Sequence, residues 1–273
     1  MTGGATYVLG SSDPEIARLD AQAASIAMPT AMLLRTAGIG PGMRVLDLGT
    51  GPGHVAFEVA ELVGPTGFVV GLDQDPRMIA AAEERRAARG IEHMVFTTGD
   101  ARAFRAEQPF DAVVARLLLF HLPDAVHVLR QHVDGLAPGG LAVAIDFDLG
   151  SARAEPPCEL PDRALDWLNV AFRSAGADPV IGSRLGMLLG EAGLTDVSSL
   201  GLQIYFAPDD PAGPMLLTSV VRSLAPQIVS EGIATEEELG LDTLEQRIAD
   251  ELRSRSAAFL PPAVVGAWGR RAA

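Results

Sequence analysis

Short apolar runs alternate with longer amphipathic segments between residues 43 and 148. The short runs are bounded by turn residues and carry few polar positions, so each predicts a buried strand. They are Met43–Leu48, Gly67–Leu72, Met94–Thr98, Asp111–Ala115 and Leu141–Phe147. The segments between them with helical length and spacing are Gly53–Val63, Pro76–Arg89 and Ala125–Leu136. Strands that alternate with helices predict an α/β fold with a parallel sheet covered on both faces.

The flanking segments continue this pattern less regularly. Asp13–Ala37 reads as helical, because Ser12 or Asp13 can cap it and Pro14 suits its first turn. Ser151–Pro161 is rich in proline and small residues and reads as a loop. Further helices are predicted at Arg163–Arg173, Arg184–Ala192, Met215–Ser230 and Thr235–Arg255, and further strands at Asp196–Phe206 and Phe259–Gly269.

The predicted elements divide the chain into three parts. Residues 1–40 form an N-terminal helical cover, and residues 41–150 form the ligand-binding core. Residues 151–273 complete the sheet and carry helical insertions at about 151–180 and 209–257. Helices inserted between the last two strands are typical of a cap over a substrate, and surface decoration is the alternative interpretation.

Composition narrows the function classes. With 35 acidic and 21 basic side chains the chain has a formal net charge of −14, and 48% of it is hydrophobic. An acidic protein repels the phosphate backbone, so we expect no nucleic-acid partner. Every basic side chain is arginine, which excludes a Schiff-base lysine and a phosphate-loop lysine. The apolar content excludes disorder.

The sequence offers no disulfide or recognisable metal motif. Cys158 is the only cysteine, and the five histidines form no HExxH pattern, so we expect no metal. No basic leader opens the chain and no apolar run is long enough to span a bilayer, which leads us to expect a cytoplasmic protein without a membrane segment. A homo-oligomer is left open.

The sharpest local signal is the segment VLDLGTGPGH, residues 45–54. A strand ends near Asp47, and the glycines Gly49, Gly51 and Gly53 then open a helix. Glycine lets the backbone approach a ligand closely, and a helix N-terminus supplies free N–H groups. A dinucleotide fingerprint would require glycine at the position of His54, so the spacing disfavours a nicotinamide cofactor.

Other polar residues follow the neighbouring strands. Asp73 closes the second predicted strand, Asp100 and Ala101 follow the third, and Arg116 and Leu117 follow the fourth. A carboxylate at the first of these positions can accept both hydroxyl protons of a ribose. All lie at carboxyl ends of parallel strands, where open α/β sheets bind ligands.

These motifs together resemble class I S-adenosylmethionine-dependent methyltransferases of the UbiE-like small-molecule type. The resemblance rests on VLDLGTGPG, VVGLDQD, TTGDA, FDAVVARLLLFHLPD and LAPGGLAVAIDFD, in family order and spacing. It implies a Rossmann-like sheet that is mostly parallel with an antiparallel last strand. The opening YVLGSSDPEIARLDAQ resembles an N-terminal helix that covers the cofactor, whereas residues 150–258 resemble nothing that identifies the acceptor.

The resemblance also implies roles for individual residues. Gly49, Thr50 and Gly51 would face the methionine moiety of S-adenosylmethionine, and Asp73 would bind the ribose hydroxyls. Asp47 would orient the glycine loop or reach the methionine amino group through water. Adenine contacts would come from Gln74, Met78, Asp100 and Ala101. Arg116 would meet the methionine amino group through its carbonyl, although the family often has a small polar residue there. The remaining members of the predicted cofactor-binding set are Tyr7, Gln22, Arg102 and Leu117.

Candidate catalytic residues are fewer. His121 follows the fourth strand and suits a general base, but a histidine in such a turn often braces loop backbone instead. Asp146 and Asp148 share one side of the fifth strand, and Asp148 is the better candidate for substrate contact, with a capping role as its alternative. Tyr7 and Gln22 are equally consistent with a packed aromatic and a solvated amide.

Two histidines, His127 and His132, lie on one predicted helix. Their five-residue separation places them about 140° apart around the axis, which favours surface residues over a metal pair.

The sequence therefore favours an enzyme that moves a methyl group from S-adenosylmethionine to a small organic acceptor at O, N or C, in secondary or quinone-like metabolism, and releases S-adenosylhomocysteine. A first alternative is an S-adenosylmethionine-binding protein that catalyses a rearrangement or cyclisation without methyl transfer. A nicotinamide-dependent enzyme is the weaker alternative.

Overall fold

The computed structural model describes residues 13–273, which form two compact units. The first unit extends to Asp146 and also includes Ser183–Gly201 and Val264–Ala273. The second unit consists of Phe147–Gly182 and Leu202–Ala263. Two separate stretches of chain therefore build the second unit.

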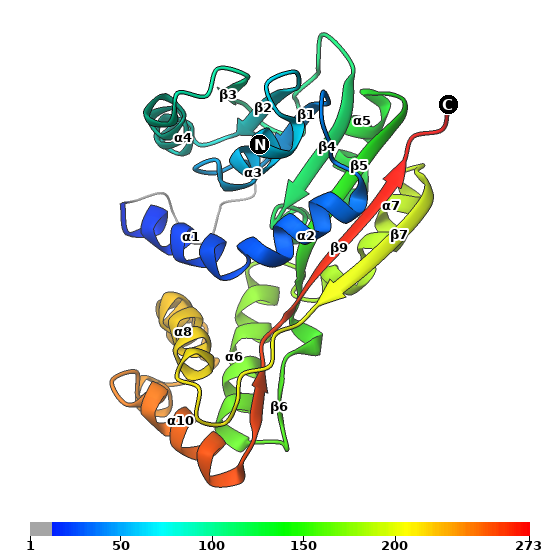
Figure 1. Cartoon of the computed structure of the whole chain (residues 1–273). Coiled ribbons are helices and arrows are strands. Elements are labelled where there is room, and N and C mark those ends of the chain that lie inside the picture. Colours follow the sequence, from blue (N-terminus) through cyan, green and yellow to red (C-terminus); the bar gives the residue numbers. More distant parts are fainter. Residues whose placement is uncertain (1–12) are drawn as a thin grey trace. The chain divides into compact units, whose positions relative to one another are not determined.

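A seven-stranded sheet organises the first unit (Figure 1). Its strands are β1 (Arg44–Leu48), β2 (Phe68–Asp73), β3 (Met94–Thr98), β4 (Phe110–Arg116), β5 (Leu136–Asp148), β7 (Thr195–Leu202) and β9 (Ala263–Arg270). They lie in the order β3-β2-β1-β4-β5-β9-β7. Strands β1 to β5 run parallel, and β9 runs the opposite way. The expected mostly parallel sheet with an antiparallel last strand is confirmed.

The strand order reverses beside β1, with β2 and β3 on one side and β4 and β5 on the other. Open α/β sheets bind ligands at the carboxyl ends of the strands that flank such a reversal. Leu48 of β1 pairs in register with Leu72 of β2 and Ala115 of β4. The residues that follow these three strands are therefore brought to one edge of the sheet.

Apolar residues on both faces of β1 explain why it is central. Val45, Leu46 and Leu48 are each at most 2% exposed. A strand that buries both faces reads as a continuous apolar run and requires helices on each side. This packing fixes the strand end from which the glycine loop begins.

Helices cover both faces of the sheet. They are α1 (Asp13–Ser25), α2 (Ala27–Ala37), α3 (His54–Val63), α4 (Pro76–Arg89), α5 (Ala125–Asp134) and α7 (Leu185–Glu191), with a short 3₁₀ turn, η1, at Leu119–His121. Figure 1 shows α2 on one face and α5 and α7 on the other. A Cβ added to Gly266 of β9 would lie 2.8 Å from Leu33 Cδ2 of α2, so this helix packs closely on the sheet.

The second unit is mostly helical. Its elements are η2 (Leu149–Ser151), β6 (Arg153–Glu155), α6 (Glu159–Ser174), α8 (Ala212–Ser230), α9 (Glu236–Leu239), α10 (Leu244–Arg255) and β8 (Ala258–Leu260), and η3 (Ile181–Arg184) spans its boundary with the first unit. Helix α6 packs against α8 and α10, and β6 pairs antiparallel with β8. Among the residues described, every helix is too short or too polar to span a bilayer.

Proline divides two of the segments that the sequence predicts as helical or extended. Residues 13–37 form two helices, because Pro29 has no N–H and its ring clashes with the carbonyl of the residue four positions earlier, Ser25, where α1 ends. The expected strand Phe259–Gly269 is two strands, β8 and β9, separated by Pro261 and Pro262, which cannot donate to a strand ladder.

Two further boundaries differ. The expected loop Ser151–Pro161 contains strand β6 and the start of α6. The expected helix Thr235–Arg255 is broken at Gly240, which adopts a left-handed conformation with φ of 49° and ends α9. Glycine costs little in a left-handed conformation, so α9 ends there and α10 begins at Leu244.

Candidate functional site

The loop after β1 has the backbone that its glycines predict. Gly49, Gly51 and Gly53 adopt φ values of 65°, 52° and 92°, a region that favours glycine over other residues. A Cβ added to Gly51 would meet nothing within 4 Å, so open space lies beside the middle of the loop. At Gly53 a Cβ would lie 2.8 Å from Phe57 and 2.9 Å from Phe96, so this glycine serves packing.

Asp47, a residue of β1, supports the glycine loop through a hydrogen bond of its side chain. It is 1% exposed, and its Oδ2 accepts a hydrogen bond from Thr50 Oγ1 at 2.6 Å. Burial raises the pKa of Asp47 to about 7, although the Thr50 hydrogen bond and the charge of Arg116 oppose this rise. The structure thus joins Asp47 to a residue of the glycine loop.

The raised pKa of Asp47 predicts a measurable effect of pH on stability. Because the folded protein binds this proton more tightly than the unfolded chain, the stability that protonation gives is lost as the pH rises from about 4 to about 7. Asp47→Asn keeps an acceptor for Thr50 and removes the buried charge. Its free energy of unfolding relative to the parent protein should rise through this window by at most about 1.4 kcal/mol per pH unit. Urea unfolding at pH 4.5, 5.5, 6.5 and 7.5 measures it, and a constant difference would contradict the assignment.

Asp73 links the end of β2 to the glycine loop. Its Oδ2 accepts from the Gly51 N–H at 2.8 Å, and its Oδ1 accepts from the Asp75 N–H at 2.9 Å. Burial raises the pKa of Asp73, and these backbone hydrogen bonds oppose the rise. Each oxygen retains acceptor capacity, since a carboxylate offers about four lone-pair sites. The carboxylate can therefore hold the loop and also accept from a ligand.

The residues after Asp73 lie beside it. Gln74 is exposed, whereas Met78, in the first turn of α4, is 4% exposed. Asp75 caps α4 by accepting from the Arg77 N–H at 2.9 Å. The chain thus turns directly from β2 into the helix that carries Met78.

The turn after β3 is held by α5. Asp100 Oδ1 accepts from the Arg102 N–H at 2.8 Å, which fixes the turn. The carbonyl of Ala101 accepts from His132 Nε2 at 2.8 Å and from Gln131 Nε2 at 3.1 Å. Two side chains of one helix therefore position this peptide, a link that the sequence did not predict.

Two expectations change at this turn. His132 was expected at the surface but is 6% exposed, because its ring reaches inward to the Ala101 carbonyl. Arg102, in the predicted cofactor-binding set, forms an ion pair with Asp124 at 3.0 Å. Its guanidinium is thus already engaged with a neighbouring carboxylate.

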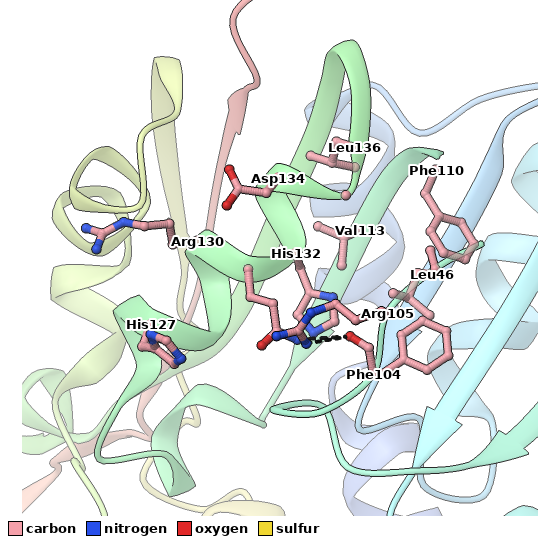
Figure 2. Close-up of a pocket in the computed structure, with 13 residues that line it drawn as sticks. Leu46, Phe104, Arg105, Phe110, Val113, His127, Arg130, His132, Asp134 and Leu136 are labelled. Carbon is pink, nitrogen blue, oxygen red and sulfur yellow. Dashed lines mark hydrogen bonds between the residues drawn. The ribbon is translucent and has the colours of Figure 1, made fainter. Parts of the chain in front are cut away.

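A cavity of about 370 Å³ lies between this turn and α5, and Figure 2 shows the side chains that line it. Leu46 and Val113 from the sheet contribute apolar walls, and His127, Arg130 and His132 line it from α5. Gln131, which also lines the cavity, bonds the carbonyls of Ala101 and Phe104. The residues that line this cavity include none from the glycine loop.

The end of β4 carries a cation and an unusual backbone. Arg116 Nη1 donates to Thr30 Oγ1 of α2 at 3.2 Å, and burial lowers the pKa of Arg116 against the opposing charge of Asp47. Leu117 has φ of 54°, which costs a non-glycine residue about 1 to 3 kcal/mol and is often seen at functional sites. Leu118 Cδ1 lies 3.0 Å from the Cβ position of Gly49.

Helix α1 is tied to the glycine loop. Asp20 bonds His54 Nε2 at 2.7 Å and the two terminal nitrogens of Arg85 at 2.9 and 3.0 Å. Although partial burial opposes it, the hydrogen bonds from Arg85 and His54 lower the pKa of Asp20. Gln22 is half-buried and its Oε1 lies 3.5 Å from Arg18 Nη1.

The sequence did not predict this Asp20–His54–Arg85 cluster, since its members lie far apart along the chain. Of its three members, only His54 stands beside a recognisable sequence motif, because it follows the last glycine of the loop. Tyr7 lies outside the described residues.

The candidate catalytic residues differ in their surroundings. Burial, and then the charge of Arg18, lowers the pKa of His121 to about 4. Asp146 is 1% exposed and its Oδ2 accepts from the Phe120 N–H at 3.1 Å, so it braces the η1 turn. Asp148 belongs to the second unit, where its Oδ1 accepts from the Gly150 N–H at 3.0 Å.

Residues 13–273 contain no group of three or more His, Cys, Asp or Glu side chains arranged to hold a metal ion. Asp47, Asp73, Arg116 and the glycine loop therefore form the candidate site. It combines open space beside Gly51 with a carboxylate at the end of β2.

Comparison with known proteins shows the family of the chain. A methyltransferase-domain model matches residues 39–171. The chain is 30% identical over 211 residues to methyltransferase str2 of Strobilurus tenacellus, an alignment that covers 76% of this chain and 74% of that protein. The chain therefore belongs to the methyltransferase family.

Other relatives match over shorter regions. Trans-aconitate 2-methyltransferase of Streptomyces avermitilis is 40% identical over 114 residues, which cover 40% of this chain and 42% of that protein. The chain thus aligns with less than half the length of that relative.

Among solved structures, phosphoethanolamine N-methyltransferase 2 of Haemonchus contortus, in complex with phosphomonomethylethanolamine and S-adenosylhomocysteine, has a TM-score of 0.57 at 16% identity. The match covers 89% of this chain and 52% of that one. At this identity the likeness shows the fold.

Proposed function

We propose that this protein transfers the methyl group of S-adenosylmethionine to a small organic acceptor and releases S-adenosylhomocysteine. The observation that carries the proposal is Asp73, whose carboxylate closes β2 while accepting a hydrogen bond from Gly51 in the glycine loop. Membership of the methyltransferase family supports it further.

The residues at the sheet edge suit this cofactor. The open space beside Gly51 accommodates a ligand against the loop backbone, and Asp73 has acceptor capacity for ribose hydroxyls. Asp100 and Ala101 would meet the adenine, with Gln74 and Met78 beside it. Thr50 and Gly49 would face the methionine moiety. Arg102 is a weaker member of this set, because Asp124 already engages it.

The proposed reaction depends mainly on the geometry in which the reacting atoms are held. The bound cofactor supplies a methyl group on a sulfonium, and displacement there requires the nucleophile, methyl carbon and sulfur in line. Holding the reactants in this geometry can contribute about 7 to 11 kcal/mol. The backbone of the glycine loop and the carboxylate of Asp73 would hold the cofactor, and the strained Leu117 would shape the acceptor side of the site.

A titration tests cofactor choice directly. We expect calorimetry to show binding of S-adenosylhomocysteine and none of NAD⁺, since His54 occupies the position where a dinucleotide loop has glycine. The reverse result would remove the proposal and restore the nicotinamide alternative.

His121 is expected to act as a neutral brace at physiological pH. With a pKa of about 4, its imidazole is a weak base, because an effective general base has a pKa near the working pH. His121→Gln keeps a hydrogen-bonding amide, and its kcat should stay within about tenfold of the parent rate between pH 6 and 9. Stopped assays for S-adenosylhomocysteine measure this, and a loss of 100-fold or more in folded protein would favour proton removal by His121.

The second unit is proposed to select the acceptor, with residues 151–180 and 209–257 as its helical cap. Asp148, which belongs to this unit, remains a candidate for acceptor contact, although it also caps η2. Exchanging residues 209–257 for the same segment of a methyltransferase with another acceptor should change the acceptor KM and leave the affinity for S-adenosylhomocysteine nearly unchanged. Equal losses of both would assign the segment to scaffolding.

A further inference from the structure

Arg116 is a half-buried cation with few partners. Among the residues that the structure describes, one of its five N–H donors is engaged, from Nη1 to Thr30 Oγ1 at 3.2 Å. No carboxylate in residues 13–273 forms an ion pair with it. A cation taken out of water is costly unless an anion or several hydrogen bonds compensate it.

The guanidinium is nevertheless held in place. Thr30 is 2% exposed and donates its own hydroxyl proton to the Ile26 carbonyl at 2.8 Å, so its lone pairs face Arg116. The hydroxyl therefore acts as a fixed acceptor on α2. Such a contact orients the guanidinium without neutralising it.

Its position is beside the glycine loop. Ala115 of β4 pairs in register with Leu48, the last residue of β1, so Arg116 and Gly49 follow directly from two paired positions on adjacent strands. The charge of Arg116 also acts on Asp47 below the loop and on His54 at its far end. Asp47 forms no ion pair with Arg116, and its Oδ2 accepts from Thr50.

We propose that the Arg116 guanidinium binds a carboxylate at the mouth of the glycine loop, namely the carboxylate of the methionine moiety of S-adenosylmethionine. This inference rests on the proposed function and adds a side-chain role to a residue whose carbonyl alone was implicated. Paired N–H donors of arginine match the two oxygens of a carboxylate in a bidentate geometry. A carboxylate on the acceptor is the other source of the same chemistry.

Decarboxylated S-adenosylmethionine tests the first source, because it keeps the sulfonium, the amine and the adenosine and lacks only the carboxylate. We expect Arg116→Gln to weaken S-adenosylmethionine binding about 10- to 100-fold and to change binding of the decarboxylated form by no more than about twofold. Thr30→Val removes the acceptor that orients the guanidinium. It should lower the ratio of the affinity for S-adenosylmethionine to the affinity for the decarboxylated form by a smaller factor. The control is Arg35→Gln. Arg35 lies on α2, as Thr30 does, but its side chain is 63% exposed and pairs with Glu58 at 3.6 Å. It should leave the ratio unchanged.

Tricarballylate, a simple tricarboxylate, tests the second source on protein loaded with S-adenosylhomocysteine. Loss of its binding in Arg116→Gln, with an unchanged cofactor ratio, would keep the carboxylate site and assign it to the acceptor. The inference would be overturned if Arg116→Gln left the ratio of the two cofactor affinities unchanged and tricarballylate binding was unchanged or absent in the parent protein. It would also be overturned if Arg116→Gln weakened binding of S-adenosylmethionine and of its decarboxylated form equally. If the parent protein binds neither cofactor, the proposed function fails as well.

Discussion

Replacing Asp73 with alanine is expected to weaken S-adenosylhomocysteine binding about 10- to 150-fold, equivalent to about 1.5 to 3 kcal/mol for lost hydrogen bonds to a charged group. The carboxylate has two roles in this account. It would accept from the ribose hydroxyls, and it accepts from the N–H groups of Gly51 and Asp75. Asp73→Asn should also bind S-adenosylhomocysteine weakly, because an amide offers one acceptor oxygen where the structure uses two. Isothermal titration calorimetry measures both variants.

Asp111→Ala supplies the matched control. Asp111 Oδ2 also accepts from a backbone N–H, that of Arg44 at 2.8 Å, but it lies near the opposite ends of the strands. This variant should lose some stability and keep its affinity for S-adenosylhomocysteine. Unchanged affinity in Asp73→Ala would remove the end of β2 from the site.

The second large effect separates two glycines of the same loop. Gly53→Ala places a Cβ 2.8 Å from Phe57 and 2.9 Å from Phe96 at a φ of 92°. Overpacking of about 1 to 3 kcal/mol and left-handed strain of about 1 to 2 kcal/mol should together lower its stability strongly. Gly51→Ala bears only the strain, because its Cβ meets nothing within 4 Å.

The ranking of the two variants by cofactor affinity should differ from their ranking by stability. The Cβ of Gly51→Ala extends into the space proposed for the methionine moiety, so this variant should bind S-adenosylhomocysteine poorly while remaining the more stable of the two. Urea unfolding and calorimetry on both proteins measure these quantities. Full affinity in Gly51→Ala would contradict the placement of the cofactor against this loop.

Much of the sheet and the glycine loop could be predicted from sequence because their signals are local. The strand Met94–Thr98 and the helix Pro76–Arg89 have the predicted bounds, since apolar periodicity, a proline at the first turn and a glycine beyond the last mark their ends. The positive φ values of Gly49 and Gly51 likewise follow from residue type.

Contacts between distant segments could not be predicted in this way. The burial of His132, the link from Thr30 to Arg116 and the contact of Asp20 with His54 join residues 31, 86 and 34 positions apart. No periodicity records such pairs, because only the fold brings them together. The depressed pKa of His121 also depends on burial, which a single turn motif does not specify.

Transfer of an isotopically labelled methyl group tests the central claim most directly. Purified protein would be incubated with S-adenosylmethionine carrying a trideuterated methyl group and a panel of small organic acceptors that includes trans-aconitate. Mass spectrometry would follow S-adenosylhomocysteine and the labelled product. We expect the two products to form in equal amounts and Asp73→Ala to slow the formation of both. An acceptor that is rearranged or cyclised without gaining the label, while S-adenosylmethionine is recovered intact, would contradict methyl transfer.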